Sequence, residues 1–168
     1  MKRTALVAAA LWLLAGCVTV DSGKEKNEKV TGPATGAAEH VVVKVLSGDT
    51  VQLDSGEVVR YAGVKAPARG EDFFEEARLA NERLVFGKNV RVRVKFVDRV
   101  RDESQRRFAH LYTPGHTIKL MTWVNAELLE GGWCRLDYRA LAARFEQRFE
   151  EREAAARAAR RGMWKTRG

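Results

Sequence analysis

The chain has 168 residues, enough for one ordinary domain with its own hydrophobic core. Its 30 Lys and Arg residues outnumber its 22 Asp and Glu residues, which gives a formal net charge of +8. This positive charge argues against a cationic partner and favours nucleic acid, anionic lipid or lipopolysaccharide. The charge alone does not distinguish among these three polyanions. The 3 histidines lack the spacing typical of zinc ligands, so they do not indicate a zinc site.

The first residues have the pattern of an export signal. Lys2 and Arg3 precede an apolar stretch that is too short to span a bilayer comfortably, and the stretch ends in LAGC at residues 14–17. Small residues before a cysteine resemble a bacterial lipoprotein signal. We therefore expect a signal peptide over residues 1–16 and acylation of Cys17, which would anchor the chain to a membrane surface. A plain secretory signal and an uncleaved anchor are the alternatives.

The residue after the cysteine bears on localisation. Val18 stands there, not an aspartate of the kind that resembles an inner-membrane retention signal. We therefore expect an exported protein anchored to the cell envelope, at the outer membrane or the periplasmic face if the source is Gram-negative. With Cys17 acylated, only Cys134 remains, so no intramolecular disulfide can support the fold.

The stretch after the signal is polar. Residues 21–39, DSGKEKNEKVTGPATGAAE, contain glycines and few large apolar side chains. Such a composition is typical of a flexible segment. We expect a tether over residues 17–39 and a folded domain over residues 40–168.

The folded domain begins with three short strands and a helix. Apolar runs at residues 41–46, 50–53 and 58–64 are separated by the turn sequences SGD and DSG. A helix follows over about residues 71–86, with apolar side chains at helical spacing and Gly87 as its predicted cap.

The second half contains two strands and two helices. Strict alternation predicts a strand over residues 89–97, and a hairpin turning at PG follows over residues 107–120. A short helix over residues 122–132 ends in glycines, and a long one covers about residues 139–161. Three strands, a helix, two strands and two helices predict an α+β fold: a five-stranded OB-fold β-barrel with three helices.

The same elements carry a family resemblance. In order, the chain shows SGDTVQL, VRYAGVKAP, a helix containing EEA, RVRVKFVD, RDESQRRFAHLY, WVNAELLEGGW and a terminal GMW. From Val41 to Trp164 it resembles the staphylococcal-nuclease-like (thermonuclease) domain. The resemblance implies an OB barrel that hydrolyses DNA and RNA with calcium, and we expect a monomer. In such a domain two aspartates and a carbonyl hold the ion, two arginines clamp the phosphate, and a glutamate assists the attacking water.

Four residues match the positions of that site. Asp49 matches the first metal aspartate, Arg60 and Arg106 match the phosphate clamp, and Tyr138 matches an aromatic that stacks on a base. Calcium prefers hard oxygen ligands, and the arginine fork suits phosphate oxygens. The alternative roles are a turn aspartate that caps its own backbone and arginines that are simply solvated. If the match to the family pattern is shifted by one residue, Arg107 takes the place of Arg106.

Two positions depart from the family. Lys65 stands where the second metal aspartate is expected, and Ala68 stands where the glutamate is expected. A cation within about 4–6 Å would oppose calcium by several kcal/mol. Loss of a general base typically costs about 10²–10⁴ in rate. With Arg60 and Arg106, however, Lys65 could hold phosphate without any metal.

The sequence therefore leads to a functional hypothesis with two alternatives. The hypothesis is a membrane-anchored thermonuclease-like domain that binds nucleic acid or another phosphorylated ligand, with catalysis weakened or lost. The first alternative is an active metal-dependent endonuclease, in which Glu71 or Asp72 serves as the base. The second is a structural envelope lipoprotein whose barrel binds a protein.

Overall fold

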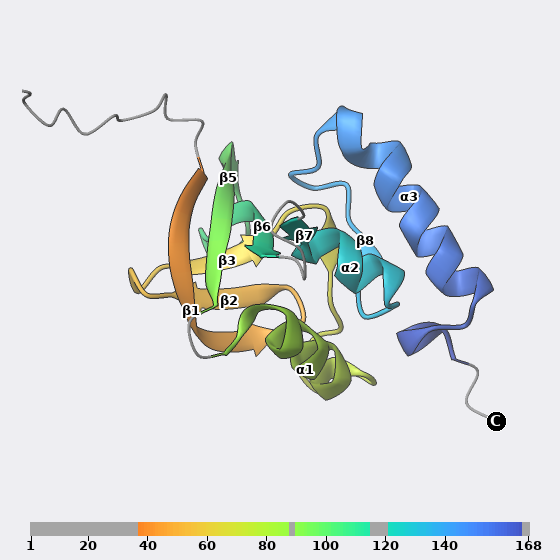
Figure 1. Ribbon diagram of the computed structural model, residues 1–168. Helices are drawn as coiled ribbons and strands as arrows, with labels where there is room; N and C mark the ends of the chain where they lie inside the picture. Colours follow the sequence, from red (N-terminus) through yellow and green to blue (C-terminus); the bar gives the residue numbers. More distant parts are fainter. Residues whose placement is uncertain (1–36, 88–89, 115–120, 166–168) are drawn as a thin grey trace, which may run out of the picture. The chain divides into compact units, whose positions relative to one another are not determined.

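A closed ring of five strands forms the centre of the domain (Figure 1). The computed structural model describes residues 37–87, 90–114 and 121–165. The ring has the order β3-β2-β1-β5-β6 and is closed by a parallel pairing of β3 with β6. Its strands are β1 (Ala37–Ser47), β2 (Thr50–Leu53), β3 (Val58–Tyr61), β5 (Arg91–Arg101) and β6 (Arg107–Pro114).

Three short strands lie outside the ring. β7 (Met121–Trp123) pairs with β6, while β4 (Val64–Lys65) and β8 (Arg135–Leu136) form a separate two-stranded sheet. The predicted strand over 58–64 is thus divided. Gly63 has a positive φ of 79°, a conformation that favours glycine, and it turns the chain from β3 into β4.

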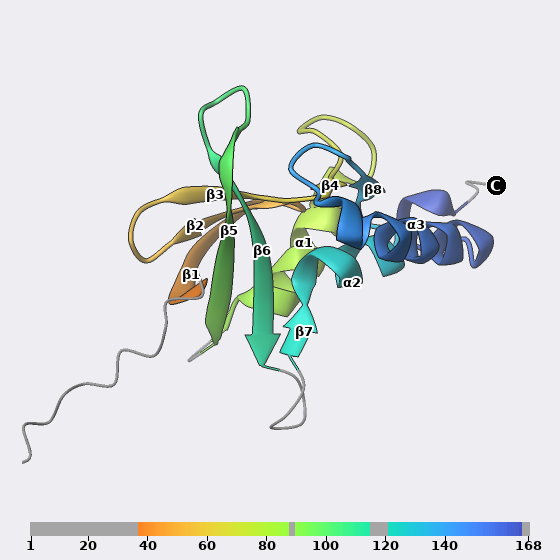
Figure 2. The same cartoon turned by 90° about the horizontal axis from the view of Figure 1, so that it is seen from above.

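The helices lie together at one side of the ring (Figure 2). Within the described residues they are α1 (Phe74–Val85), α2 (Val124–Glu130), α3 (Ala143–Ala158) and the 3-10 turn η1 (Gly162–Trp164). Helix α1 packs against β1, α2 packs against β6, and α3 packs on α2. None of these helices is both long and apolar enough to cross a membrane. The predicted α+β barrel of five strands with three α-helices is confirmed for the described part of the chain.

Two helices begin later than their sequence patterns predicted. Phe73 has a left-handed backbone with φ 67°, so α1 starts at Phe74 and not near Glu71. Ala140 has φ 58°, and the side chain of Asp137 accepts a hydrogen bond from the backbone N–H of Arg139. These local features delay α3 to Ala143.

The strand boundaries also differ from the predictions. β1 begins at Ala37, earlier than the predicted Val41, because residues 37–39 pair with residues 93–95 of β5. The predicted signal peptide, Cys17 and most of the predicted tether lie outside the described residues, as do residues 115–120 of the predicted hairpin.

Alternating apolar residues from all five ring strands fill the barrel. Val51, Val59, Val92 and Leu111 are fully buried. Burying such side chains contributes roughly 1.5–3 kcal/mol each.

A buried amide ties the closing seam of the ring to α2. The side chain of Asn125 donates to the carbonyls of Ala62 and Ala109 and accepts from the amide of Leu111. The seam therefore holds β3 and β6 in a fixed register, with Arg60 opposite Phe108.

Candidate functional site

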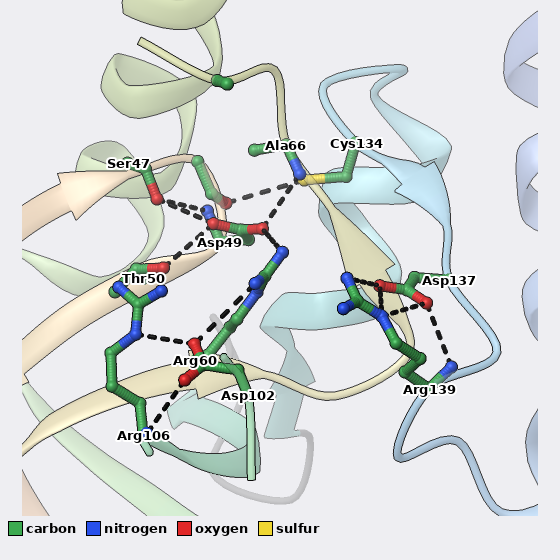
Figure 3. A network of polar contacts seen from close by, with 12 residues as sticks. Ser47, Asp49, Thr50, Arg60, Ala66, Asp102, Arg106, Cys134, Asp137 and Arg139 are labelled. Atoms are coloured by element: carbon green, nitrogen blue, oxygen red, sulfur yellow. Dashed lines mark hydrogen bonds and ion pairs between the residues drawn. The ribbon is translucent and has the colours of Figure 1, made fainter. Parts of the chain in front are cut away.

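The turn between β1 and β2 presents a buried aspartate. Asp49 is only 6% exposed. Its Oδ1 accepts hydrogen bonds from the hydroxyls of Ser47 (2.7 Å) and Thr50 (3.0 Å), and its Oδ2 accepts one from the amide of Ala66 (3.1 Å) (Figure 3). Gly48 lets this turn approach closely, because a Cβ there would lie 2.8 Å from the Cβ of Ala66. The carboxylate is thus built into the fold.

Arg60 of β3 reaches toward this carboxylate. Its Nη2 lies 3.5 Å from Asp49 Oδ2, and its Nη1 lies 3.7 Å from Asp102 Oδ2 and 3.6 Å from Glu103 Oε2. These ion pairs are long compared with ordinary charge-assisted hydrogen bonds of about 2.7–2.9 Å. The Nε of Arg60 is buried and has no acceptor among the described residues. The guanidinium is held in place, yet it retains donor capacity.

Arg106 is anchored by the same aspartate. The Nε of Arg106 donates to Asp102 Oδ2 at 2.6 Å, and the amides of Arg106 and Ser104 both donate to Oδ1 at 2.9 Å. Burial raises the pKa of Asp102, but the hydrogen bonds and charge of Arg106 outweigh it, so the pKa is lowered overall. Asp102 is therefore a charged anchor that Arg60 and Arg106 share (Figure 3).

The segment from Lys65 to Arg69 forms the other wall. Lys65 is exposed and forms no ion pair with a described carboxylate, and Ala68 presents no functional group. The carboxylate of Glu71 folds back so that Oε2 accepts the amide hydrogen of Ala68 at 2.8 Å. Sequence reasoning missed Arg69, which follows this turn and lines the same space. The one indication of this role in the sequence is that a basic residue stands two positions after Pro67.

These elements enclose a cavity of about 280 Å³. Four cationic side chains and one carboxylate line it. They are Asp49, Arg60, Lys65, Arg69 and Arg106. The predicted residues Asp49, Arg60, Lys65 and Arg106 therefore do converge, and the site they form is strongly basic.

The fit of a calcium ion can be judged from these donors. Calcium takes six to eight oxygen ligands, usually including several carboxylates. Asp49 is the one carboxylate of the cavity, and hydroxyl, amide and guanidinium donors already surround it. In the described ranges, no group of three or more His, Cys, Asp or Glu side chains is placed to hold a metal ion. The residues present do not fit calcium.

Tyr138 lies apart from this cavity. It is 57% exposed, and its hydroxyl donates to Glu150 of α3 at 2.7 Å. Glu153, also on α3, accepts the nearby amide of Leu136. The predicted stacking role of Tyr138 stays a prediction, in acidic surroundings that do not favour a phosphate backbone.

Cys134 and Arg139 complete the surroundings of the site. The Cys134 thiol lies 3.6 Å from the carbonyl of Gly48, and burial raises its pKa, which makes it a packed thiol and not a nucleophile. Arg139 binds Asp137 and Glu103, so it orients the acid that also contacts Arg60.

The comparisons with known proteins agree with this architecture. Residues 58–166 match the family described as staphylococcal nuclease homologue, and the chain belongs to this family. A micrococcal nuclease from Shigella flexneri is 32% identical over 140 residues, which cover 80% of this chain and 78% of that protein.

Proposed function

We propose that the domain binds nucleic acid, or another phosphorylated ligand, in the Asp49–Arg106 cavity, with phosphodiester hydrolysis weakened or lost. One observation carries this proposal: four cationic side chains share the cavity with a single carboxylate that is already saturated with donors. Asp102 and Glu103 neutralise part of the charge of Arg60 and Arg106, but Lys65 and Arg69 are exposed and form no ion pair with a described carboxylate. The remaining positive charge attracts a phosphate group without the help of a metal ion.

Arg60 and Arg106 supply directional contacts to this phosphate. The terminal nitrogens of Arg60 lie 3.5–3.7 Å from their carboxylate partners, so they can still donate shorter hydrogen bonds to a phosphate oxygen. Asp102 restrains both guanidinium groups and so reduces the entropy that they lose on binding. Lys65 adds an exposed point charge at the rim.

The weakened hydrolysis follows from the opposite wall. Ala68 offers no base, and Lys65 brings a positive charge to the place where the family resemblance implies a metal ligand. Neither group can activate a water molecule for attack on phosphorus.

The test uses the full chain and a labelled single-stranded oligonucleotide, first in EDTA and then in calcium. Arg106→Gln should weaken binding in EDTA by roughly 10- to 100-fold, because charge-assisted hydrogen bonds contribute about 1.5–3 kcal/mol. Lys65→Gln should weaken it less, because the side chain is exposed. The matched control is Arg83→Gln, an exposed arginine of α1 that does not line the cavity. Unchanged affinity in Arg106→Gln, with the fold intact by circular dichroism, contradicts the proposal.

One observation favours an active nuclease as the second candidate. Glu71 places a carboxylate oxygen 2.8 Å from the amide of Ala68, close to where a base is missing. The relative from Shigella flexneri is named a micrococcal nuclease. If this candidate is correct, the oligonucleotide is cut in calcium, magnesium or manganese, and both Glu71→Gln and Asp49→Asn abolish the cleavage.

We also propose that the chain is exported as a monomer and is anchored to the envelope by acyl groups on Cys17. The LAGC sequence at residues 14–17 supports this proposal. Labelling cells with a radioactive fatty acid should mark the wild-type protein and not Cys17→Ser, which should leave the membrane fraction. Equal labelling of the two forms would exclude acylation at this position.

A further inference from the structure

A second basic surface lies on the outside of the barrel. It comprises Arg93 and Lys95 of β5, Tyr112 of β6, and Arg144 and Arg148 of α3, and we name it the β5–α3 surface. Arg93 lies opposite Tyr112, and Lys95 lies opposite His110, in the antiparallel pairing of β5 with β6. None of these five residues lines a cavity described above.

Aromatic rings join the strand half of this surface to the helix half. Tyr112 stacks on Trp123 with ring centroids 5.9 Å apart, and Phe145 of α3 lies edge-on to Trp123 at 4.9 Å. The guanidinium of Arg148 lies 5.3 Å from the Trp123 ring centre, and that of Arg144 lies 4.7 Å from the Phe145 ring centre. Arg144 and Arg148 therefore lie over a cluster of aromatic rings.

These cations are poorly neutralised by the protein. Lys95, Arg144 and Arg148 form no ion pair with any described carboxylate, and Arg93 has only a 3.9 Å contact with Glu39. On the same helix, by contrast, Arg152 binds Glu127 and Arg157 binds Glu153. The charges on the β5–α3 surface thus remain available to an external anion.

Two acids of helix α3 lie on its β8 side, because Glu150 and Glu153 accept hydrogen bonds from the Tyr138 hydroxyl and the Leu136 amide. Arg148 contacts the ring of Trp123, on which Tyr112 stacks, so Arg144 and Arg148 lie on the side of the helix nearer β6. Glu151, three residues after Arg148, accepts a hydrogen bond from Gln147.

Strand β6 sets the separation between this surface and the Asp49–Arg106 cavity. Arg106 directly precedes the strand and Tyr112 lies near its end, whereas Phe108 and His110 between them are buried. The six residue steps from Arg106 to Tyr112 span about 20 Å. At the B-form spacing of about 3.4 Å per nucleotide, that span needs roughly six nucleotides.

We infer that the β5–α3 surface is a second contact site for single-stranded nucleic acid, which holds phosphates of the same strand that occupies the cavity. This inference rests on the proposed function of the cavity. Arginine and lysine would contact successive phosphates, and Tyr112 would offer a ring for a base. The separation of about 20 Å from the cavity, which a short oligonucleotide can span, favours nucleic acid over anionic lipid as the occupant.

The experiment compares a 5′-phosphorylated thymidine dinucleotide, too short to reach both sites, with a thymidine 12-mer in EDTA. Arg144→Gln/Arg148→Gln in the full chain should leave dinucleotide affinity unchanged and weaken the 12-mer about tenfold at low salt. The slope of log K against log[salt] should become shallower by about 1.4, because each phosphate contact on a single strand contributes about 0.7.

The matched control removes two other exposed charges, with Lys44→Gln/Arg83→Gln, and should not change the difference between the two ligands. A 12-mer affinity and salt slope equal to those of the wild type would overturn the inference. So would a loss of binding to phosphatidylglycerol vesicles without a loss of 12-mer binding, which would assign the surface to a membrane. Arg106→Gln separates the two proposals: if it leaves dinucleotide affinity unchanged, the cavity proposal fails, whatever the α3 variant does.

Discussion

The Asp49–Arg106 cavity and the β5–α3 surface are both basic, but they hold their arginines differently. In the cavity, Arg60 and Arg106 are fixed by Asp102, a buried carboxylate. On the surface, Arg144 and Arg148 lie on aromatic rings and bind no described carboxylate. Guanidinium groups that are held in one orientation can donate directional hydrogen bonds to a single phosphate group. Unpaired guanidinium groups attract any polyanion electrostatically, whatever its shape.

Removing the charge of Asp102, which anchors the cavity arginines but not the surface arginines, should have the largest effect. Asp102→Asn keeps the shape of the side chain but removes the charge that faces two arginines. We expect the free energy of unfolding to fall by about 3 kcal/mol, because breaking a buried ion pair leaves charges uncompensated. Urea denaturation measures this value. A variant as stable as the wild type would show that Asp102 does not anchor the site.

The buried ring of His110, beneath the β5–α3 surface, should make the free energy of unfolding depend on pH. Burial, followed by the charges of Lys95 and Arg144, lowers the pKa of His110 from its ordinary 6.5 to about 4. The unfolded chain therefore binds a proton near pH 6.5, whereas the folded chain does not until near pH 4. The contribution of His110 to the free energy of unfolding is fully present above pH 6.5 and falls by about 3 kcal/mol as the pH drops to 4.

Denaturation curves measured between pH 7 and pH 4 test the role of His110. His110→Phe keeps an aromatic ring against Trp123 and Phe145 and should reduce the slope of stability in this window. An unchanged slope would assign the pH dependence to other groups.

Changing the charge of the rim should affect the cavity alone. Lys65→Asp/Ala68→Glu replaces an exposed cation and a methyl group with carboxylates. We expect metal-free dinucleotide affinity to fall by about tenfold or more and calcium binding to appear, because the cavity would gain two oxygen ligands. Isothermal titration with calcium and with the dinucleotide measures both effects. The difference in affinity between the 12-mer and the dinucleotide should persist in this variant.

The smallest effect is expected at Tyr138. Stacking on a base is worth about 1–3 kcal/mol, but the contact with Glu150 places this ring beside a negative charge. Tyr138→Ala should therefore weaken oligonucleotide binding about fivefold at most. Fluorescence anisotropy measures it. A loss as large as that of Arg106→Gln would show that the base does stack there.

Much of this architecture is encoded locally. Alternating apolar residues over 89–97 and the turns SGD and DSG predict the strands, and their order predicts the barrel. The convergence of Asp49, Arg60 and Arg106 was accessible through the family resemblance, since these residues lie at the ends of recognisable elements.

Other features depend on contacts that no local pattern reveals. The start of α3 is set by a left-handed Ala140 and by hydrogen bonds within residues 137–139. Arg69 joins the cavity because the turn after Pro67 folds back through the Glu71–Ala68 hydrogen bonds. The β5–α3 surface exists only because Phe145 packs against Trp123 and His110.

The closing seam of the ring has a consequence for the order of folding. It joins Val59–Tyr61 to Arg107–Ala109, segments separated by α1 and the whole of β5, and the buried Asn125 binds both sides. Contacts between such distant segments form late, after the entropy of closing the loop has been overcome. Arg60 and Arg106 lie on opposite sides of that seam. A nascent or partly folded chain would therefore contain every cation of the cavity, but Arg60 and Arg106 would not yet lie in one site.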